Sequence, residues 1–129
     1  MVPPSIELPL ALSRKYVIED VLASGGFGVV LRARQRDLDR PVAIKMLRPE
    51  AFDIEPEALE RFHTEAQIAA HLSHPNIVGI IDQCFEGGAW IVYEFVEGRS
   101  LRQIIDDDGP MPWDTATEVI EQVAEALAV

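Results

Sequence analysis

The stretch Ala23-Ser24-Gly25-Gly26-Phe27-Gly28-Val29-Val30 decides the fold, because it ends one run of strand-forming residues and begins another. Residues 16–22 are β-branched or apolar except for two acidic side chains, and residues 29–36 alternate between two faces with the period of a strand. Glycines in such a turn let backbone N–H groups face phosphate oxygens, because no Cβ intervenes. A plain hairpin turn also favours glycine, so the turn alone leaves both interpretations open.

The residues after the glycines exclude two common nucleotide motifs. A dinucleotide-binding turn needs a helix directly after the glycines, whereas a strand is predicted over 29–36. A Walker loop needs Gly-Lys-Ser or Gly-Lys-Thr, and Gly28 is followed by Val29-Val30. A phosphate site here would therefore lie in a strand–turn–strand setting.

A turn at 37–41 leads to a third strand, Val42-Ala43-Ile44-Lys45-Met46-Leu47, so three consecutive antiparallel strands are predicted. Alternation along that strand puts Ala43 and Lys45 on one face. A small residue two positions before a lysine leaves room for a flat ring beside a cation that points at phosphates. The alternative is an edge-strand lysine that points into water.

One amphipathic helix follows, beginning at Pro56 and ending before the break at 73–76. Its apolar residues recur at helical spacing, and Glu65 lies three residues after Phe62 and four before Ala69. Glu65 is therefore on or beside the apolar stripe, where a carboxylate needs a partner, and Lys45 is the nearest candidate. A solvated position at the edge of the stripe is the alternative.

The remaining sequence predicts two more strands and two helices. Strand-like runs at 77–85 and 89–95 are joined by Glu86-Gly87-Gly88, which gives the order β-β-β-α-β-β. Ser100 is expected to cap a helix over 100–105, and the acidic run 106–108 to begin a Gly-Pro turn that breaks the chain. Asp114 is expected to cap a final helix with one apolar stripe, made of Ala116, Val119, Ile120, Val123, Ala124, Leu127 and Ala128.

These elements give an α+β fold, with a five-stranded antiparallel sheet, one main helix and two further helices after it. Residues 1–13 contain three prolines and no clear periodicity, so we expect a leader that lies over the domain rather than an element of it. The final apolar stripe runs to the last residue without a stop signal, which suggests that the chain ends inside a helix.

Composition and charge limit the classes of function. The 129 residues, 48% of them hydrophobic, allow one domain with a core of ordinary size. Acidic residues outnumber basic ones 22 to 11, so a nucleic-acid partner is not expected. The charge is uneven, because residues 1–50 carry 8 basic and 6 acidic side chains and residues 51–129 carry 3 and 16.

The single cysteine and the N-terminus point to a compartment. Cys84 cannot form an intramolecular disulfide, and its apolar neighbours favour a buried, inert thiol in a reducing environment. Residues 1–7 lack the features of a signal peptide, and no apolar run approaches the ~18 residues of a membrane span. We therefore expect a cytoplasmic location and no membrane segment.

Taken in this order, the motifs resemble the beginning of a protein kinase catalytic domain of the bacterial serine/threonine type. The stretch 24–30 resembles the family's glycine-rich loop, 42–45 its nucleotide-holding strand and Glu65 its helix C glutamate. His74-Pro75-Asn76-Ile77-Val78 resembles the turn after that helix, and 93–98 the hinge, with Tyr93 at the gatekeeper position. The resemblance implies a leader at 1–15, a kinase N-terminal lobe with an ATP-binding cleft and hinge at 16–98, and the start of a C-terminal lobe at 99–129.

The resemblance also implies ATP as cofactor and a protein substrate. Lys45 would hold the α- and β-phosphates while paired with Glu65, and these two are the expected catalytic residues. Leu22, Val30 and Ala43 would enclose the adenine, and backbone groups of Glu94 and Val96 would bond its edge. The expected nucleotide-binding residues are Leu22, Ala23, Ser24, Gly25, Gly26, Phe27, Gly28, Val30, Ala43, Lys45, Tyr93, Glu94 and Val96.

Two departures from the family pattern matter. Ala23 stands where the family has the first glycine of the loop, and its methyl group could restrict the turn. No His-Arg-Asp or Asp-Phe-Gly motif occurs in the 129 residues, so Mg²⁺ is expected only together with those segments and this chain alone is expected to be inactive. The acidic run 106–108 is expected to be a solvated loop, and no metal ligand is assigned.

The leading hypothesis is the ATP-binding part of a serine/threonine kinase that transfers the γ-phosphate to protein hydroxyls. Two alternatives remain: a pseudokinase that binds nucleotide or acts as a scaffold, and an acidic interaction module without nucleotide. The apolar stripe of the last helix further predicts self-association of the chain.

Overall fold

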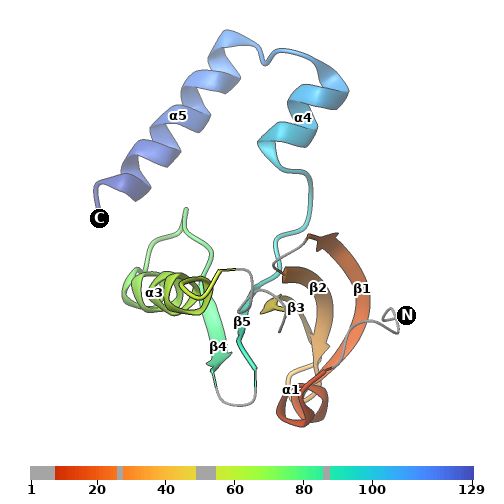
Figure 1. The fold of residues 1–129 in the computed structure, drawn as a ribbon. Coiled ribbons are helices and arrows are strands. Elements are labelled where there is room, and N and C mark those ends of the chain that lie inside the picture. The colour runs from red at the N-terminus through yellow and green to blue at the C-terminus, as the bar shows by residue number, and fades with distance from the viewer. Residues whose placement is uncertain (1–7, 26–27, 49–54, 86–87) are drawn as a thin grey trace. The chain divides into compact units, whose positions relative to one another are not determined.

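A computed structural model describes residues 8–25, 28–48, 55–85 and 88–129 (Figure 1). The chain divides into two compact units. The sheet unit comprises Met1–His71 and Gly79–Phe95, and the helical unit comprises Leu72–Val78 and Val96–Val129. The class is α+β, as the sequence predicts.

The sheet unit is built on five antiparallel strands in the order β1-β2-β3-β5-β4, which confirms the predicted sheet. The first three, β1 (Tyr16–Ser24), β2 (Gly28–Gln35) and β3 (Arg40–Leu47), follow one another along the chain. The other two, β4 (Ile80–Cys84) and β5 (Trp90–Glu94), come after the main helix, and β5 pairs with β3. The strand expected from residue 77 begins only at Ile80, because Pro75 and Asn76 lie in a turn before it.

Each face of the sheet carries its own apolar cluster. On one face, residues of β1, β2, β3 and β5 pack with a residue from the N-terminal segment, and the members are Leu12, Tyr16, Val29, Leu31, Ala33, Val42, Ile44, Met46, Trp90 and Val92. On the other face, Phe62 and Ala66 of the main helix pack on Ala89 and Ile91. This division confirms the alternation predicted for 29–36 and 42–47, since the pleat sends successive side chains to opposite faces.

A short helix, α1 (Leu10–Lys15), precedes the sheet, where the sequence predicts an irregular leader outside the domain. Leu12 is fully buried in the first cluster, and the neighbouring Tyr16 donates its hydroxyl to Asp82 Oδ2 at 3.2 Å. Lys15 pairs with the same carboxylate at 3.2 Å. The expectation was wrong because a helix of six residues with one buried side chain is too short to show a hydrophobic period.

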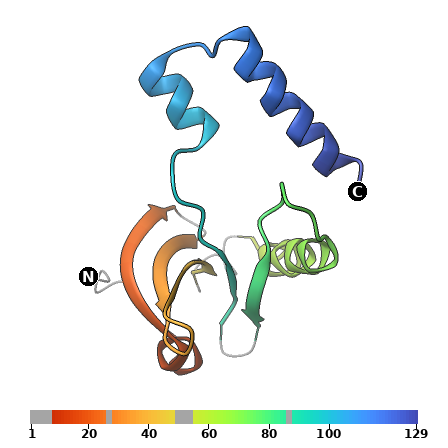
Figure 2. The ribbon, with the colours of Figure 1, turned by 180° about the vertical axis from the view of Figure 1, so that it is seen from behind.

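The main helix, α3 (Ala58–His71), lies beside β4 in both views (Figures 1 and 2). It begins two residues after Pro56, which lies in the turn before it. Glu60 occupies the first turn, where its negative charge suits the helix dipole, and His71 lies in the last turn. Phe62 and Ala66 of the predicted apolar stripe are buried, as is Ala58, whereas Leu59 is 37% exposed, so only part of the stripe is buried.

The helical unit contains α4 (Leu101–Asp108) and α5 (Trp113–Leu127). Ser100 caps α4 as predicted: its hydroxyl accepts from the Gln103 amide at 3.1 Å, and the Gln103 side chain accepts from the Ser100 amide at 2.7 Å. The acidic run 106–108 was expected in a turn but forms the last turn of α4. The helix extends through it because Arg99 pairs with Asp107 and Asp108, and Arg102 with Asp106, which offsets the repulsion of three adjacent carboxylates.

The expected cap of α5 is also corrected. Pro112 occupies the N-cap position without a side-chain hydrogen bond, and Asp114 lies in the first turn of the helix. A proline just before a helix fixes φ at a compatible value, and an acidic side chain in the first turn suits the dipole, so both residues favour the start without forming a cap. Within the same unit, Asn76 donates its side-chain N–H to the Gln122 carbonyl of α5 at 2.9 Å. None of the described helices has both the length and the apolar character of a membrane span.

Candidate nucleotide site

Lys45 and Glu65 form an ion pair at the centre of the candidate site. Lys45 Nζ lies 3.0 Å from each oxygen of the Glu65 carboxylate, so the predicted contact between β3 and α3 is present. The side chains are 41% and 46% exposed, so the pair is open to water on one side. Lys45 Nζ also lies 5.7 Å from the centre of the Phe62 ring, which adds a cation–π contact from the same helix.

Sheet register brings three further predicted residues to the face that carries Lys45. Val30 is the cross-strand partner of Lys45, and Ala43 is the partner of Tyr93. Cross-strand partners share a face, so Val30, Ala43, Lys45 and Tyr93 form one surface of half-buried side chains.

Tyr93 makes a contact that the sequence does not predict. Its hydroxyl donates to Glu65 Oε1 at 2.9 Å, so the carboxylate is held by both Lys45 and a phenol. Burial, followed by the hydrogen bond to Glu65, raises the pKa of Tyr93 above its ordinary value. The phenol therefore stays protonated and remains a donor well into the alkaline range.

The structure describes the residues of the glycine turn before Gly26 and after Phe27. Gly26 and Phe27 themselves, which are both predicted nucleotide-binding residues, lie outside the described residues. The Gly25 amide donates to the Gly28 carbonyl at 2.9 Å, and the Ser24 hydroxyl accepts from Arg48 at 2.6 Å. A Cβ on Gly28 would lie 2.7 Å from the Met46 carbonyl oxygen of β3, whereas a Cβ on Gly25 would meet no atom within 4 Å. Gly28 is therefore required by the close approach of β2 to β3.

Ala23 and Leu22 lie in β1. Ala23 pairs with Val30, is exposed and does not have a positive φ, so the strand accepts alanine at this position without strain. A register shift falls between Val21 and Ala23, and the intervening Leu22 is 46% exposed. The departure from the family pattern at Ala23 thus leaves the strand before the turn intact.

The two hinge residues belong to different units. The Glu94 amide donates to the Gly79 carbonyl at 3.0 Å, and its carboxylate accepts from the Gly79 amide at 3.1 Å. Because the Glu94 amide is already bonded to the Gly79 carbonyl, the Glu94 carbonyl is the backbone group of this residue that could bond a ligand. Val96 is the first residue of the second stretch of the helical unit and is 66% exposed.

One aromatic contact near the hinge was also missed. The guanidinium of Arg32 lies 4.7 Å from the centre of the Phe95 ring and 3.6 Å from Glu19. Arg32 is the cross-strand partner of Ala43, and the alternation along 29–36 does place it on the face with Val30. The alternation could have predicted which face Arg32 lies on, but it gave no reason to choose Phe95 as its partner.

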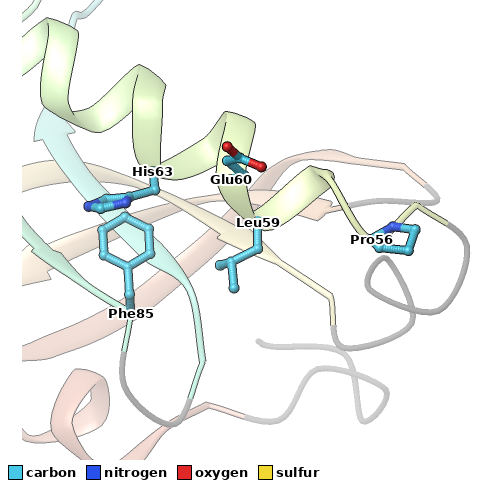
Figure 3. A pocket seen from close by; sticks show the side chains of 5 residues that line it. All are labelled: Pro56, Leu59, Glu60, His63 and Phe85. Carbon is cyan, nitrogen blue, oxygen red and sulfur yellow. The ribbon is translucent and has the colours of Figure 1, made fainter.

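A hollow of about 320 Å³ lies elsewhere in the sheet unit, at the start of α3 (Figure 3). Leu59, Glu60 and His63 of the helix line it together with Pro56 and Phe85. The rings of His63 and Phe85 lie against one another with centroids 4.6 Å apart. None of the predicted nucleotide-binding residues lines this hollow.

No group of three histidine, cysteine, aspartate or glutamate side chains suited to a metal ion occurs within the described ranges. The three aspartates at 106–108, the one acidic run in the sequence that invites such an assignment, are engaged by Arg99 and Arg102. Cys84 is half-buried against the first apolar cluster.

Comparison with known proteins identifies the family of this chain. The sequence model of the family described as "Protein kinase domain" matches residues 16–129. The chain is 40% identical to the serine/threonine-protein kinase PknB of Mycobacterium leprae over 124 residues, covering 92% of this chain and 20% of that protein. It is 42% identical to the serine/threonine-protein kinase PrkC of Bacillus subtilis over 120 residues, covering 91% of this chain and 18% of that protein.

A solved structure is similar as well. The PknI kinase domain of Mycobacterium tuberculosis superposes with a TM-score of 0.72 and 29% identity, over 88% of this chain and 46% of the other. The chain thus spans about a fifth of the length of the curated relatives it matches, and about half of that solved kinase domain. With a family match over residues 16–129, this chain belongs to the protein kinase domain family.

Proposed function

We propose that this chain is the ATP-binding portion of a serine/threonine protein kinase that transfers the γ-phosphate of ATP to protein hydroxyls. The observation that carries the proposal is the Lys45–Glu65 pair, with Nζ at 3.0 Å from both carboxylate oxygens, on the sheet face shared by Val30 and Ala43. The names of the relatives, which are serine/threonine kinases, support the choice of substrate hydroxyl.

Lys45 is the residue that binds the α- and β-phosphates. An ammonium group has three donors, and Glu65 takes two of them, which leaves one for a phosphate oxygen. The carboxylate fixes the long lysine side chain toward α3, so less conformational entropy is lost when a nucleotide binds. Catalysis of phosphoryl transfer depends on such positioning and on compensation of charge.

The adenine packs between apolar side chains of the sheet, with Val30 and Ala43 supplying the surface next to Lys45 and Leu22 a further edge. The Glu94 carbonyl bonds the edge of the ring. The glycine turn covers the phosphates with backbone N–H groups. The close approach of Gly28 to Met46 fixes the point at which the turn ends and β2 begins.

Phosphoryl transfer needs groups beyond this set. When bound, Mg²⁺ neutralises the charge that develops on the phosphates, and in the family the Asp-Phe-Gly and His-Arg-Asp segments supply its ligands and the catalytic aspartate. The 129 residues contain neither motif, and we assign no residue of this chain to the metal. We therefore propose that these residues bind ATP and require those segments for transfer.

The test compares phosphate transfer by a protein that joins this chain to those segments with transfer by its Lys45→Met variant. We expect transfer to fall by at least a hundredfold in Lys45→Met. Lys15→Met changes the only other lysine of the sequence, which pairs with Asp82, and should keep wild-type activity. Equal activity of Lys45→Met and wild type would overturn the proposal.

The same protein separates the two alternatives. A pseudokinase would bind ATP but show no transfer in the wild type. An acidic interaction module would show no ATP-dependent rise in melting temperature.

A further inference from the structure

Tyr93 joins the Lys45–Glu65 pair through a third hydrogen bond. Oε1 of Glu65 accepts from Lys45 Nζ at 3.0 Å and from the Tyr93 hydroxyl at 2.9 Å, and Oε2 accepts from Lys45 Nζ at 3.0 Å. We propose that Tyr93 is a positioning residue, whose hydroxyl holds Glu65 in the orientation that keeps Lys45 directed for the nucleotide. This inference rests on the proposed ATP-binding function.

The geometry of the sheet explains why Tyr93 reaches Glu65. Tyr93 is the cross-strand partner of Ala43, and Lys45 is the partner of Ile91, so Tyr93 and Lys45 are diagonal neighbours on one face. Such neighbours lie within reach of long side chains. Glu65 of α3 is reached by both side chains, at 2.9 Å from the Tyr93 hydroxyl and 3.0 Å from Lys45 Nζ.

The three side chains differ in how firmly they are held. Tyr93 packs against the cluster of Phe62, Ala66, Ala89 and Ile91. Lys45 and Glu65 are 41% and 46% exposed, and a half-exposed pair of long side chains gains little from its ion pair alone, because ordering both chains costs entropy. The Tyr93 hydroxyl, which is held by the packing of its ring, restricts the movement of the Glu65 carboxylate and so of the pair.

Chemistry also suits the role. A carboxylate has about four sites for hydrogen bonds, so Tyr93 can occupy the second site on Oε1 without displacing Lys45. When Lys45 turns toward a phosphate and its contact with Oε1 lengthens, the phenol retains the carboxylate in place. Burial and the nearby carboxylate raise the pKa of Tyr93, so the hydroxyl remains a donor into the alkaline range.

The first test is a double-mutant cycle on the ATP affinity of the full chain, with wild type, Tyr93→Phe, Glu65→Ala and the double variant. If Tyr93 acts through Glu65, Tyr93→Phe weakens ATP binding about fivefold in the wild-type background, as expected for one hydrogen bond to a charged group at a half-exposed site. In the Glu65→Ala background it has less than a twofold effect. Equal weakening in both backgrounds, or no weakening in the wild type, would overturn the proposal.

Tyr16→Phe is the matched control for that cycle. It removes the hydroxyl of the only other tyrosine, which bonds Asp82, and should leave the ATP affinity unchanged. Thermal melts of each variant confirm that it is folded. A loss of ATP affinity in Tyr16→Phe as large as that in Tyr93→Phe would mean that the loss reflects general destabilisation, which contradicts a specific role for Tyr93.

The second test needs no nucleotide. The ring-carbon NMR signals of the two tyrosines are followed through alkaline pH in the wild type and in Glu65→Ala. We expect Glu65→Ala to lower the pKa of Tyr93 toward its ordinary value and to leave the titration of Tyr16 unchanged; an unchanged Tyr93 would refute the contact. If the wild type bound no ATP, the proposed function would fail, while this titration would still decide whether Tyr93 holds Glu65.

Discussion

The sheet unit and the helical unit differ in how their elements are stabilised. Every buried hydrophobic residue found among the described residues belongs to the sheet unit, and α4 and α5 bury none. The helical unit has local contacts, namely the capping box at Ser100 and the ion pairs of Arg99 and Arg102, and one long-range hydrogen bond between Asn76 and Gln122. Such contacts are each worth about 1 kcal/mol or less.

Most residues of the proposed nucleotide site lie on the sheet unit, which is the unit with the buried core. Lys45, Glu65, Val30 and Ala43 all lie on the sheet unit, where packed strands can hold side chains to within the tolerance that binding requires. Val96 belongs to the helical unit and is 66% exposed. The comparison therefore predicts that substitutions in the sheet unit change stability and binding much more than matched substitutions in the helical unit.

The largest expected effect is from Ile44→Ala. Ile44 is fully buried between β-strands, so its truncation leaves a cavity and should lower the free energy of unfolding by about 2–5 kcal/mol. The matched variant Ile120→Ala removes a side chain that is 67% exposed and should change stability by less than about 0.5 kcal/mol. Urea unfolding of both variants measures the difference, and equal losses would break the comparison.

The next effect concerns the glycine turn. Gly28→Ala should lower the free energy of unfolding by about 1–3 kcal/mol, because the new Cβ meets the backbone of Met46 at 2.7 Å and β2 must move. Gly25→Ala has open space and an ordinary φ, so it should be neutral or slightly stabilising. If urea titrations show Gly25→Ala to be the more harmful, the close approach of β2 to β3 is not the reason for glycine at 28.

Ser100→Ala tests the local stabilisation of the helical unit. Loss of the Ser100 hydroxyl, which accepts from the Gln103 amide, should destabilise α4 by about 1 kcal/mol. The effect should be confined to that helix, so hydrogen exchange should quicken for the amides of 101–108 and stay unchanged in β3. Faster exchange in β3 would show that the two units unfold together.

A smaller effect is expected at alkaline pH from Tyr16. Burial, then the charge and hydrogen bond of Asp82, raise the pKa of Tyr16 above the ordinary 10.0. The neutral phenol is favoured in the folded state, so its stabilisation is complete below pH 10.0 and is lost as the pH rises toward the folded-state pKa. The free energy of unfolding should therefore fall less steeply above pH 10.0 in Tyr16→Phe than in wild type; identical slopes would contradict the assignment.

The smallest expected effect is the self-association of the chain through α5. Ile120, Val123 and Leu127 expose an apolar stripe, which favours contact with another copy at high protein concentration. Light scattering should show a mass that rises with concentration, and Ile120→Glu should abolish the rise. A monomer at every concentration would remove this prediction.

Much of the sheet unit could be predicted because its elements carry strong local signals. Alternation along 29–36 and 42–47 assigned the two faces of the sheet, and the helical spacing around Phe62 brought Glu65 toward Lys45. The failures occur where a tertiary or ionic contact overrides the local signal. One buried leucine gives α1 its place in the fold, and Arg99 and Arg102 extend α4 through an acidic run that otherwise favours a turn.

The contact of Tyr93 with Glu65 could not be predicted for a different reason. Alternation puts Tyr93 on the correct face of β5, but the sequence does not give the register between β5 and β3 or the height of α3 above them. A hydrogen bond depends on both. The resemblance to kinases supplied the position of Tyr93 at the hinge and nothing about its hydroxyl.

The central claim, that Lys45 faces the phosphates of ATP, is tested most directly by lysine labelling. In an ATP derivative with an acyl group on its terminal phosphate, a lysine amine near that phosphate attacks the carbonyl, forms an amide and releases ATP. The sequence has only two lysines, and mass spectrometry can follow both. We predict rapid labelling of Lys45 that excess ATP suppresses, with slow labelling of Lys15 that ATP does not affect. Equal labelling of the two lysines, insensitive to ATP, would contradict the account.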